Sequence, residues 1–146
     1  MIEALEKLGK LRRQLSQTFI SFLKPLGIAP RQAILLRYLS VQGSSSLADL
    51  ARRTVTDPAT VTRTVNLLLK KGFLRRAGHA TDRRRLEVSL TPEGKKLAEK
   101  VDRVYARTAE RMVSPLANAE RHNLIRLLDK ILNASGSGET EKGADR

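Results

Sequence analysis

The chain has no cysteine and no tryptophan, and only 3% of its 146 residues are aromatic. The missing cysteines exclude disulfide bonds, thiolate nucleophiles, cysteine-based zinc sites and thiol redox sensing, and they fit a reducing cytoplasm. No apolar run exceeds four residues, and Glu3 and Glu6 lie near the N-terminus. We therefore expect neither a signal peptide nor a membrane span. At this length a single compact domain is expected.

Basic residues outnumber acidic ones by 28 to 15, which gives a net charge of +13. Between residues 52 and 85 there are ten basic residues and two acidic ones, so more than half of the excess lies in this segment. Such a concentration favours a polyanionic partner. His79 and His122 are the only histidines, and the chain has neither a Gly-rich phosphate loop nor a metal-ligand spacing. The sequence therefore predicts no enzyme, no cofactor and no metal site.

Helical periodicity and capping residues divide most of the chain into helices. Apolar residues recur at steps of three, four or seven from Leu5 to Leu26, which predicts a long first helix. Ser46 with Asp49 forms a capping box for a short helix, and Asp57 caps the next one. We expect helices at about 1–26, 30–42, 47–53, 58–71, 92–113 and 117–133.

A short β-hairpin is expected between the fourth and fifth helices. Apolar and polar residues alternate over 86–90, which predicts a half-buried strand with 73–77 as its partner and a long tip between them. The serine run 44–46 is interpreted as a turn. Residues 134–146 are rich in Ser, Gly and charged residues and predict a disordered tail. The predicted fold class is mainly α with a small β-hairpin wing.

A short helix, a turn and a capped longer helix form a helix-turn-helix, and the basic hairpin makes it winged. The polar face of the longer helix fits a major groove, where Arg63 can donate to guanine and Asn66 can pair with adenine. The alternative is an ordinary solvated helix face. The residues expected to face the major groove are Ala59, Thr60, Thr62, Arg63 and Asn66.

The hairpin tip carries three consecutive arginines, which repel one another and are expected to serve an anionic partner. A wing-tip arginine fits the narrow minor groove, where the negative potential is concentrated. The alternative is a charged surface turn. The expected wing contacts are Asp82, Arg83, Arg84 and Arg85. The expected phosphate contacts are Ser46, Lys70, Arg75, Arg76 and His79.

Several of these segments resemble the MarR family of transcriptional regulators, and the resemblance covers residues 1–134. The matching segments are 46–51, 57–63, 71–76, 82–85 and 88–94. The resemblance implies a homodimeric winged helix-turn-helix protein, a repressor more than an activator, which binds an inverted-repeat operator in double-stranded DNA. It also implies that Asp82 holds Arg84 toward the minor groove. The chain departs from the family at Ala29 and Ala117, where Ser or Thr usually caps a helix.

The winged lobe needs only residues 30–91, and the resemblance implies that 1–26 and 92–133 form dimerisation helices. The alternative is that these helices pack only within one chain. The apolar residues expected at the dimer interface are Leu5, Leu8, Leu124, Leu127, Leu128 and Ile131.

The resemblance further implies a small amphipathic or aromatic effector, bound between the winged lobe and the dimer helices. Its candidate contacts are Phe19, Phe22, Arg37 and Tyr38, with core or surface roles as the alternative. Two other functions remain open at this point. One is a non-specific architectural, nucleoid-type DNA-binding protein, and the other is a winged module that binds protein.

Overall fold

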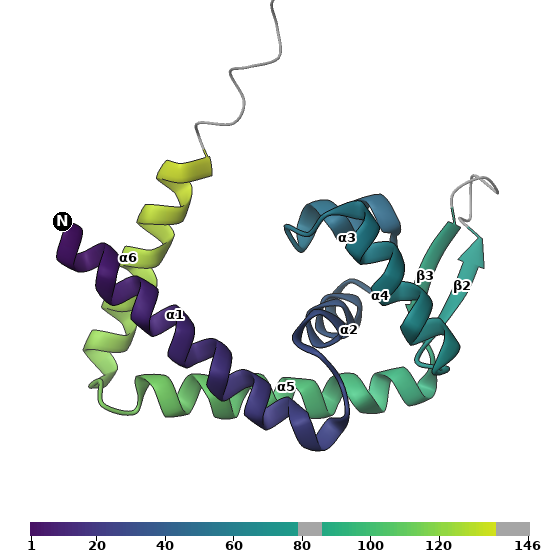
Figure 1. The fold of residues 1–146 in the computed structure, drawn as a ribbon, viewed down its shortest axis with the longest axis horizontal. Coiled ribbons are helices and arrows are strands. Elements are labelled where there is room, and N and C mark those ends of the chain that lie inside the picture. Colours follow the sequence, from purple (N-terminus) through teal and green to yellow (C-terminus); the bar gives the residue numbers. More distant parts are fainter. Residues whose placement is uncertain (79–85, 137–146) are drawn as a thin grey trace, which may run out of the picture. The chain divides into compact units, whose positions relative to one another are not determined.

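The computed structural model describes residues 1–78 and 86–136 (Figure 1). Its elements are α1 (Ile2–Leu23), the 3-10 turn η1 (Lys24–Leu26), α2 (Pro30–Gln42), β1 (Ser44–Ser46), α3 (Leu47–Arg53), α4 (Pro58–Lys70), β2 (Leu74–Gly78), β3 (Leu86–Leu90), α5 (Pro92–Val113) and α6 (Asn118–Gly136). Residues 1–108 form one compact unit, and a second unit begins at residue 109, within α5. Among the described residues no single helix is long and apolar enough to cross a membrane; only α1 with η1 and α2 reach that threshold together, across an 80° bend.

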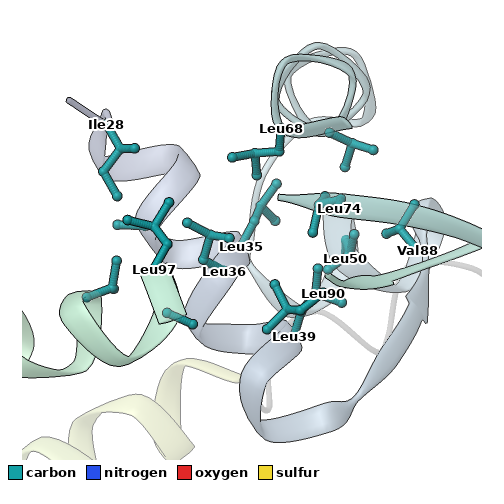
Figure 2. Packing of buried hydrophobic residues seen from close by; sticks show 14 of the residues in the cluster. Ile28, Leu35, Leu36, Leu39, Leu50, Leu68, Leu74, Val88, Leu90 and Leu97 are labelled. Atoms are coloured by element: carbon teal, nitrogen blue, oxygen red, sulfur yellow. The ribbon is translucent and has the colours of Figure 1, made fainter. Parts of the chain in front are cut away.

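The hydrophobic core of the first unit lies between α2, α3, α4, the sheet and the first half of α5 (Figure 2). Leu36, Leu50 and Leu68 come from three different helices, and each is completely buried. Val88 contributes to the core from the sheet, and it is only 1% exposed. Burial of side chains of this size stabilises a fold by about 1.5–3 kcal/mol each. The helix-turn-helix and the sheet are therefore held by one shared core.

Within the described residues the sheet has three antiparallel strands in the order β1-β3-β2. The interpretation of 44–46 as a turn is wrong, because these serines form β1 and Ser45 pairs with Val88. Ser45 is also buried, at 6% exposure. A three-residue strand is too short for an alternation of apolar and polar residues to be recognised in the sequence. The strand forms by pairing with β3, more than forty residues away.

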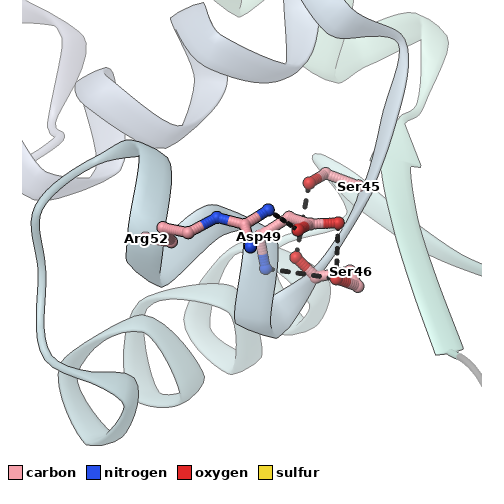
Figure 3. A network of polar contacts seen from close by, with 4 residues as sticks. All are labelled: Ser45, Ser46, Asp49 and Arg52. Atoms are coloured by element: carbon pink, nitrogen blue, oxygen red, sulfur yellow. Dashed lines mark hydrogen bonds and ion pairs between the residues drawn. The ribbon is translucent and has the colours of Figure 1, made fainter. Parts of the chain in front are cut away.

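The predicted Ser46 cap at the start of α3 is confirmed, but the reciprocal bond of a capping box, from the Ser46 backbone N–H to Asp49, is replaced by one from the Ser46 hydroxyl (Figure 3). The Asp49 backbone N–H donates to Ser46 Oγ at 3.1 Å, and the Ser46 hydroxyl donates back to Asp49 Oδ2 at 3.0 Å. Arg52 forms an ion pair with the other Asp49 oxygen. The Ser46 cap therefore satisfies one of the free backbone donors at the helix start.

Helices α2 and α6 have alanine at the N-cap and begin with a different hydrogen bond. The N–H of Ala29 donates to Gln32 Oε1 at 2.9 Å, and the N–H of Ala117 donates to Glu120 Oε2 at 2.8 Å. In each helix the side chain three residues after the alanine therefore accepts the alanine N–H. This half of a capping box needs no polar side chain at the N-cap.

Several predicted boundaries move by a few residues. The fourth helix ends at Lys70, one residue early, and Gly72 follows with a positive φ of 77°, which suits glycine. The strand expected at 73–77 lies one residue later. The last helix continues to Gly136, so residues 134–136 are helical and not part of a tail. The rest of the predicted tail and the hairpin tip lie outside the described residues.

Candidate nucleic-acid interface

The start of α4 is fixed by Asp57, as predicted. Asp57 Oδ1 accepts a hydrogen bond from the Thr60 backbone N–H at 2.8 Å, and Pro58 occupies the first helical position. Hydrogen bonding from Thr60, by its hydroxyl first and its backbone N–H second, lowers the pKa of the exposed Asp57 carboxyl below the usual 3.8. The carboxylate is therefore the preferred form of this cap.

The outward face of α4 agrees with the helical wheel at four of the five predicted positions. Ala59, Thr62, Arg63 and Asn66 are exposed. Thr60 is the exception, because it is only 5% exposed and faces the core. It lies one turn before the buried Thr64, on the flank of the apolar arc, and the Thr64 hydroxyl donates to its carbonyl oxygen. We therefore remove Thr60 from the candidate base contacts.

Arg63 is the cation at the centre of this exposed face. Its Nη2 donates to Thr60 Oγ1 at 3.3 Å, so the buried threonine anchors the arginine instead of meeting a partner itself. Among the described residues the other guanidinium N–H groups of Arg63 have no hydrogen-bond partner, so they can donate outward. Thr62 donates its hydroxyl to the Pro58 carbonyl at 2.9 Å, which leaves its oxygen and methyl group on the surface.

The side chains of the two neighbouring arginines of β2 lie on opposite faces of the sheet. Arg76 pairs with the buried Val88, and its Nη2 donates to Asn66 Oδ1 of α4 at 3.5 Å. Arg75 pairs with Ser89, and its Nε donates to the Ser89 hydroxyl at 3.2 Å. Because side chains alternate along a strand, Arg76 lies on the side of α4 and Arg75 lies on the other. The sequence predicts that both arginines contact phosphate groups. Only Arg76 lies on the side of α4, where such a contact is expected.

The other predicted phosphate and wing residues have different outcomes. Lys70 is exposed at the end of α4. Ser46 is half-buried, and its hydroxyl proton is donated to Asp49, which disfavours a phosphate beside that carboxylate. His79 and the wing residues Asp82, Arg83, Arg84 and Arg85 lie outside the described residues.

The end of α4 is tied directly to the start of α5. The Thr91 hydroxyl donates to the Gly72 carbonyl at 2.7 Å, and the Thr91 N–H donates to the Phe73 carbonyl at 3.1 Å. The same hydroxyl accepts the N–H of Gly94 at 3.0 Å, so Thr91 also caps α5. The sequence predicts the cap but not the bond to Gly72, since nothing local indicates a contact nineteen residues away. Thr91 therefore joins the turn after α4 to the first turn of α5.

The predicted dimer residues carry large exposed apolar surfaces. On α1, Leu5 is 72% and Leu8 is 46% exposed. On α6, Leu127, Leu128 and Ile131 are between 41% and 54% exposed, and Leu124 is half-buried. On each helix apolar side chains three or four residues apart lie on one face, and such a run at these exposures is unusual for a surface that faces only water.

The predicted effector residues lie on α1 and α2, and two of them, Phe19 and Arg37, contact Tyr105 of α5. The rings of Phe19 and Tyr105 meet edge to face at 4.8 Å, and the Arg37 guanidinium lies 4.8 Å from the Tyr105 ring centre. Arg37 Nε also forms an ion pair with Asp102 at 3.2 Å. Burial raises the pKa of the Tyr105 hydroxyl. The other two residues, Phe22 and Tyr38, are half-buried against the core.

This arrangement of a capped recognition helix, a wing and a three-stranded sheet is matched by proteins already known. The sequence profile of the MarR family matches residues 26–85. The uncharacterized HTH-type transcriptional regulator YhbI of Bacillus subtilis is 30% identical over 118 residues, which cover 80% of this chain and 77% of YhbI. The chain belongs to the MarR family. Because that family consists of transcriptional regulators, membership confirms the predicted regulator class and excludes an enzyme.

Two solved structures share the fold of this MarR-family chain. BpsR of Bordetella bronchiseptica, whose DNA binding is regulated by 6-hydroxynicotinic acid, is 27% identical with a TM-score of 0.78 over 86% of this chain and 90% of its own. A mutant MarR from E. coli in complex with operator DNA gives a TM-score of 0.80 at 22% identity, over 90% of this chain and 94% of its own. The predicted winged helix-turn-helix fold is therefore confirmed.

Proposed function

We propose that this MarR-family regulator is a homodimeric repressor that inserts α4 into the major groove of an inverted-repeat operator. The observation that carries the proposal is the exposed face of α4, on which Thr62, Arg63 and Asn66 present hydrogen-bonding groups. Arginine and asparagine are the side chains best suited to bidentate contacts with guanine and adenine. The excess of basic residues between 52 and 85 supports a nucleic-acid partner.

The proposed dimer follows from the exposed apolar faces of α1 and α6. Each face is covered by a second copy of the chain, since symmetric homodimers predominate among soluble oligomers and their interface cores are apolar. A two-fold axis then places two copies of α4 on two half-sites with the same sequence. Repression requires only that this dimer occupies DNA that a polymerase must use.

The proposal extends to the wing and to a ligand. The arginines Arg83, Arg84 and Arg85 add contacts to the minor groove, so Arg84→Ala lowers the salt dependence of binding by about one ion. A small amphipathic acid then changes the affinity for the operator. The relationship to BpsR, whose DNA binding responds to 6-hydroxynicotinic acid, supports such a response.

Selection from random double-stranded DNA tests the proposed function. We expect an inverted repeat whose half-site centres lie about 10–10.5 base pairs apart or slightly more. Arg63→Ala should remove the preference at one symmetric pair of positions and cost on the order of 1–3 kcal/mol. Arg103→Ala, which removes the same charge from the exposed surface of α5, is the matched control and should keep the preference.

The non-specific architectural protein predicts a different result. It binds all sequences alike, so the selection returns no inverted repeat and Arg63→Ala leaves the sequence profile unchanged. A protein-binding module would retain no DNA at all.

A further inference from the structure

Thr60 is a buried polar residue of α4, and its hydroxyl group contacts two charged side chains. The residue is only 5% exposed. Asp57 lies three residues before it and Arg63 three residues after it, and both interact with the hydroxyl. Because residues three positions apart lie on the same side of a helix, this spacing brings the acid, the hydroxyl and the base together in the first two turns of the recognition helix.

The chemistry of the two partners gives the Thr60 hydroxyl a defined direction. Arg63 Nη2 lies 3.3 Å from Thr60 Oγ1, and a guanidinium group can only donate, so the hydroxyl oxygen is the acceptor. An ionised carboxylate can only accept, so the hydroxyl proton is donated to Asp57. One chain of hydrogen bonds therefore runs from Arg63 through Thr60 to Asp57, and each bond polarises the next.

The acidic end of this chain is fixed by the start of the helix. Asp57 is the N-cap of α4, and its Oδ1 accepts the Thr60 backbone N–H at 2.8 Å. Arg63 is exposed, and a free arginine side chain has many rotamers to lose when it binds a partner. A hydrogen bond that orders this side chain before DNA arrives lowers the entropic cost of the later contact.

The bond to Thr60 leaves Arg63 with one complete pair of parallel donors. A guanidinium group has two such pairs, Nε with Nη2 and Nη1 with Nη2, and each pair uses a different Nη2 hydrogen. Because Thr60 accepts one of these two hydrogens, one pair stays intact. Two parallel donors match the O6 and N7 acceptors of guanine in the major groove.

We propose that Thr60, oriented by Asp57, is a positioning residue that holds the Arg63 guanidinium in the orientation that reads guanine. The inference rests on the proposed function, because it concerns how α4 distinguishes one base pair from another. If the hydroxyl had only a structural role, its loss would lower the stability of the fold and weaken binding to all DNA sequences alike. A positioning role instead changes the preference at the base pair that Arg63 reads.

Thr60→Val tests the proposal, because it removes the hydroxyl group and keeps a buried side chain of similar shape. The base pair in question is the one whose preference is lost in Arg63→Ala. We expect Thr60→Val to lower the ratio of affinities for guanine and adenine at this position by about threefold to tenfold, as for loss of one hydrogen bond. Binding to unrelated duplexes should not change. Thr60→Ser keeps the hydroxyl and should retain the wild-type ratio.

Thr64→Val is the matched control. Thr64 is 6% exposed, and its hydroxyl donates to the Thr60 carbonyl oxygen at 2.8 Å and not to a charged group. This variant should keep the wild-type ratio. In an Arg63→Ala background Thr60→Val should have no further effect on operator affinity, because the two residues act through one contact. Thermal melts show that each variant folds, and Thr60→Ala removes the same hydroxyl should Thr60→Val not fold.

NMR relaxation of the Arg63 guanidinium nitrogens gives a second measurement, on the full-length protein without DNA. We expect Thr60→Val to increase the mobility of this group on the picosecond-to-nanosecond timescale, and Thr64→Val to leave it unchanged. Equal mobility in the wild type and Thr60→Val would show that the hydroxyl does not hold the arginine, and would overturn the proposal.

Three binding results would also overturn it: an unchanged guanine preference in Thr60→Val, equal losses in Thr60→Val and Thr64→Val, or a further loss from Thr60→Val in the Arg63→Ala background. In each case the wild-type protein still selects an inverted repeat with guanine at the Arg63 position. Failure of the proposed function is a different result, namely a wild-type selection that returns no inverted repeat.

Discussion

The carbonyl oxygen of Phe73 lies directly against the backbone of Gly94. A Cβ atom at position 94 would come within 2.0 Å of that oxygen, so no other residue fits without displacing the backbone. The same carbonyl accepts the Thr91 N–H. The segment between α4 and β2 and the start of α5 are thus joined by a close approach that requires glycine.

Gly94→Ala should lower the free energy of unfolding by about 1–3 kcal/mol, because the added methyl group overpacks a buried backbone contact. Gly9→Ala on the exposed surface of α1 is the matched control, since a Cβ there meets no atom within 4 Å. That change should stabilise the protein by roughly 0.5–1 kcal/mol through helix propensity. Urea unfolding of both variants checks the pair, and equal shifts would argue against the Phe73 contact.

Val55 has an unfavourable backbone conformation on the surface of the protein. It has a φ of +50° in the turn between α3 and α4, and its side chain is 93% exposed. A β-branched residue in this left-handed region is strained, whereas asparagine tolerates it. Val55→Asn should therefore raise the free energy of unfolding by about 1 kcal/mol. A lower melting temperature for this variant would show that the turn is not strained.

Asp57 should make the stability of the protein depend on pH in the acid range. Its pKa is lowered in the folded state by hydrogen bonds from Thr60, so the stability that the cap contributes is complete above the unfolded pKa and is lost as the pH falls through the folded value. Melting temperatures should fall in this range for the wild type and less steeply for Asp57→Asn. Asp129→Asn removes a carboxylate from the surface of α6 and should keep the wild-type pH profile.

Arg75 and Arg76 should have unequal effects on DNA binding. Arg76 lies beside Asn66 on α4, so Arg76→Ala should weaken binding to all sequences and lower the salt slope by about one ion. Arg75 lies on the opposite face of the sheet, and Arg75→Ala should leave the salt slope of ligand-free protein unchanged. Titrations of operator DNA across salt concentrations measure both slopes. Equal slopes for the two variants would contradict the assignment of faces.

Leu128→Glu combined with Ile131→Glu should convert the dimer to monomers or aggregates, because both side chains lie on the exposed apolar face of α6. Arg126→Glu changes the total charge by the same amount on the polar side of this helix, where Arg126 donates to Asn123, and should remain dimeric. Light scattering gives the mass of each variant. A wild-type protein that is monomeric at micromolar concentration would refute the proposed dimer.

Local signals in the sequence predict much of this structure correctly. The helix 47–53, the strand 86–90 and the Asp57 cap are found where the pattern places them, because capping and short-range periodicity act within a few residues. The exposed face of α4 is also predictable, since a helical wheel depends only on the helix itself. Thr60 is the exception at the edge of that wheel, where neighbouring elements decide whether a side chain is covered.

Contacts between distant segments are determined only by the tertiary structure. The serines 44–46 become a strand because β3 offers them free backbone groups, and no local pattern announces such a partner. Arg75 and Arg76 look equivalent in the sequence, yet the pleat of β2 and its register against β3 place one beside the recognition helix and the other on the opposite face of the sheet. The close approach of Phe73 to Gly94 likewise exists only once α4, the sheet and α5 share one core, because a carbonyl and a glycine twenty-one residues apart meet through packing alone.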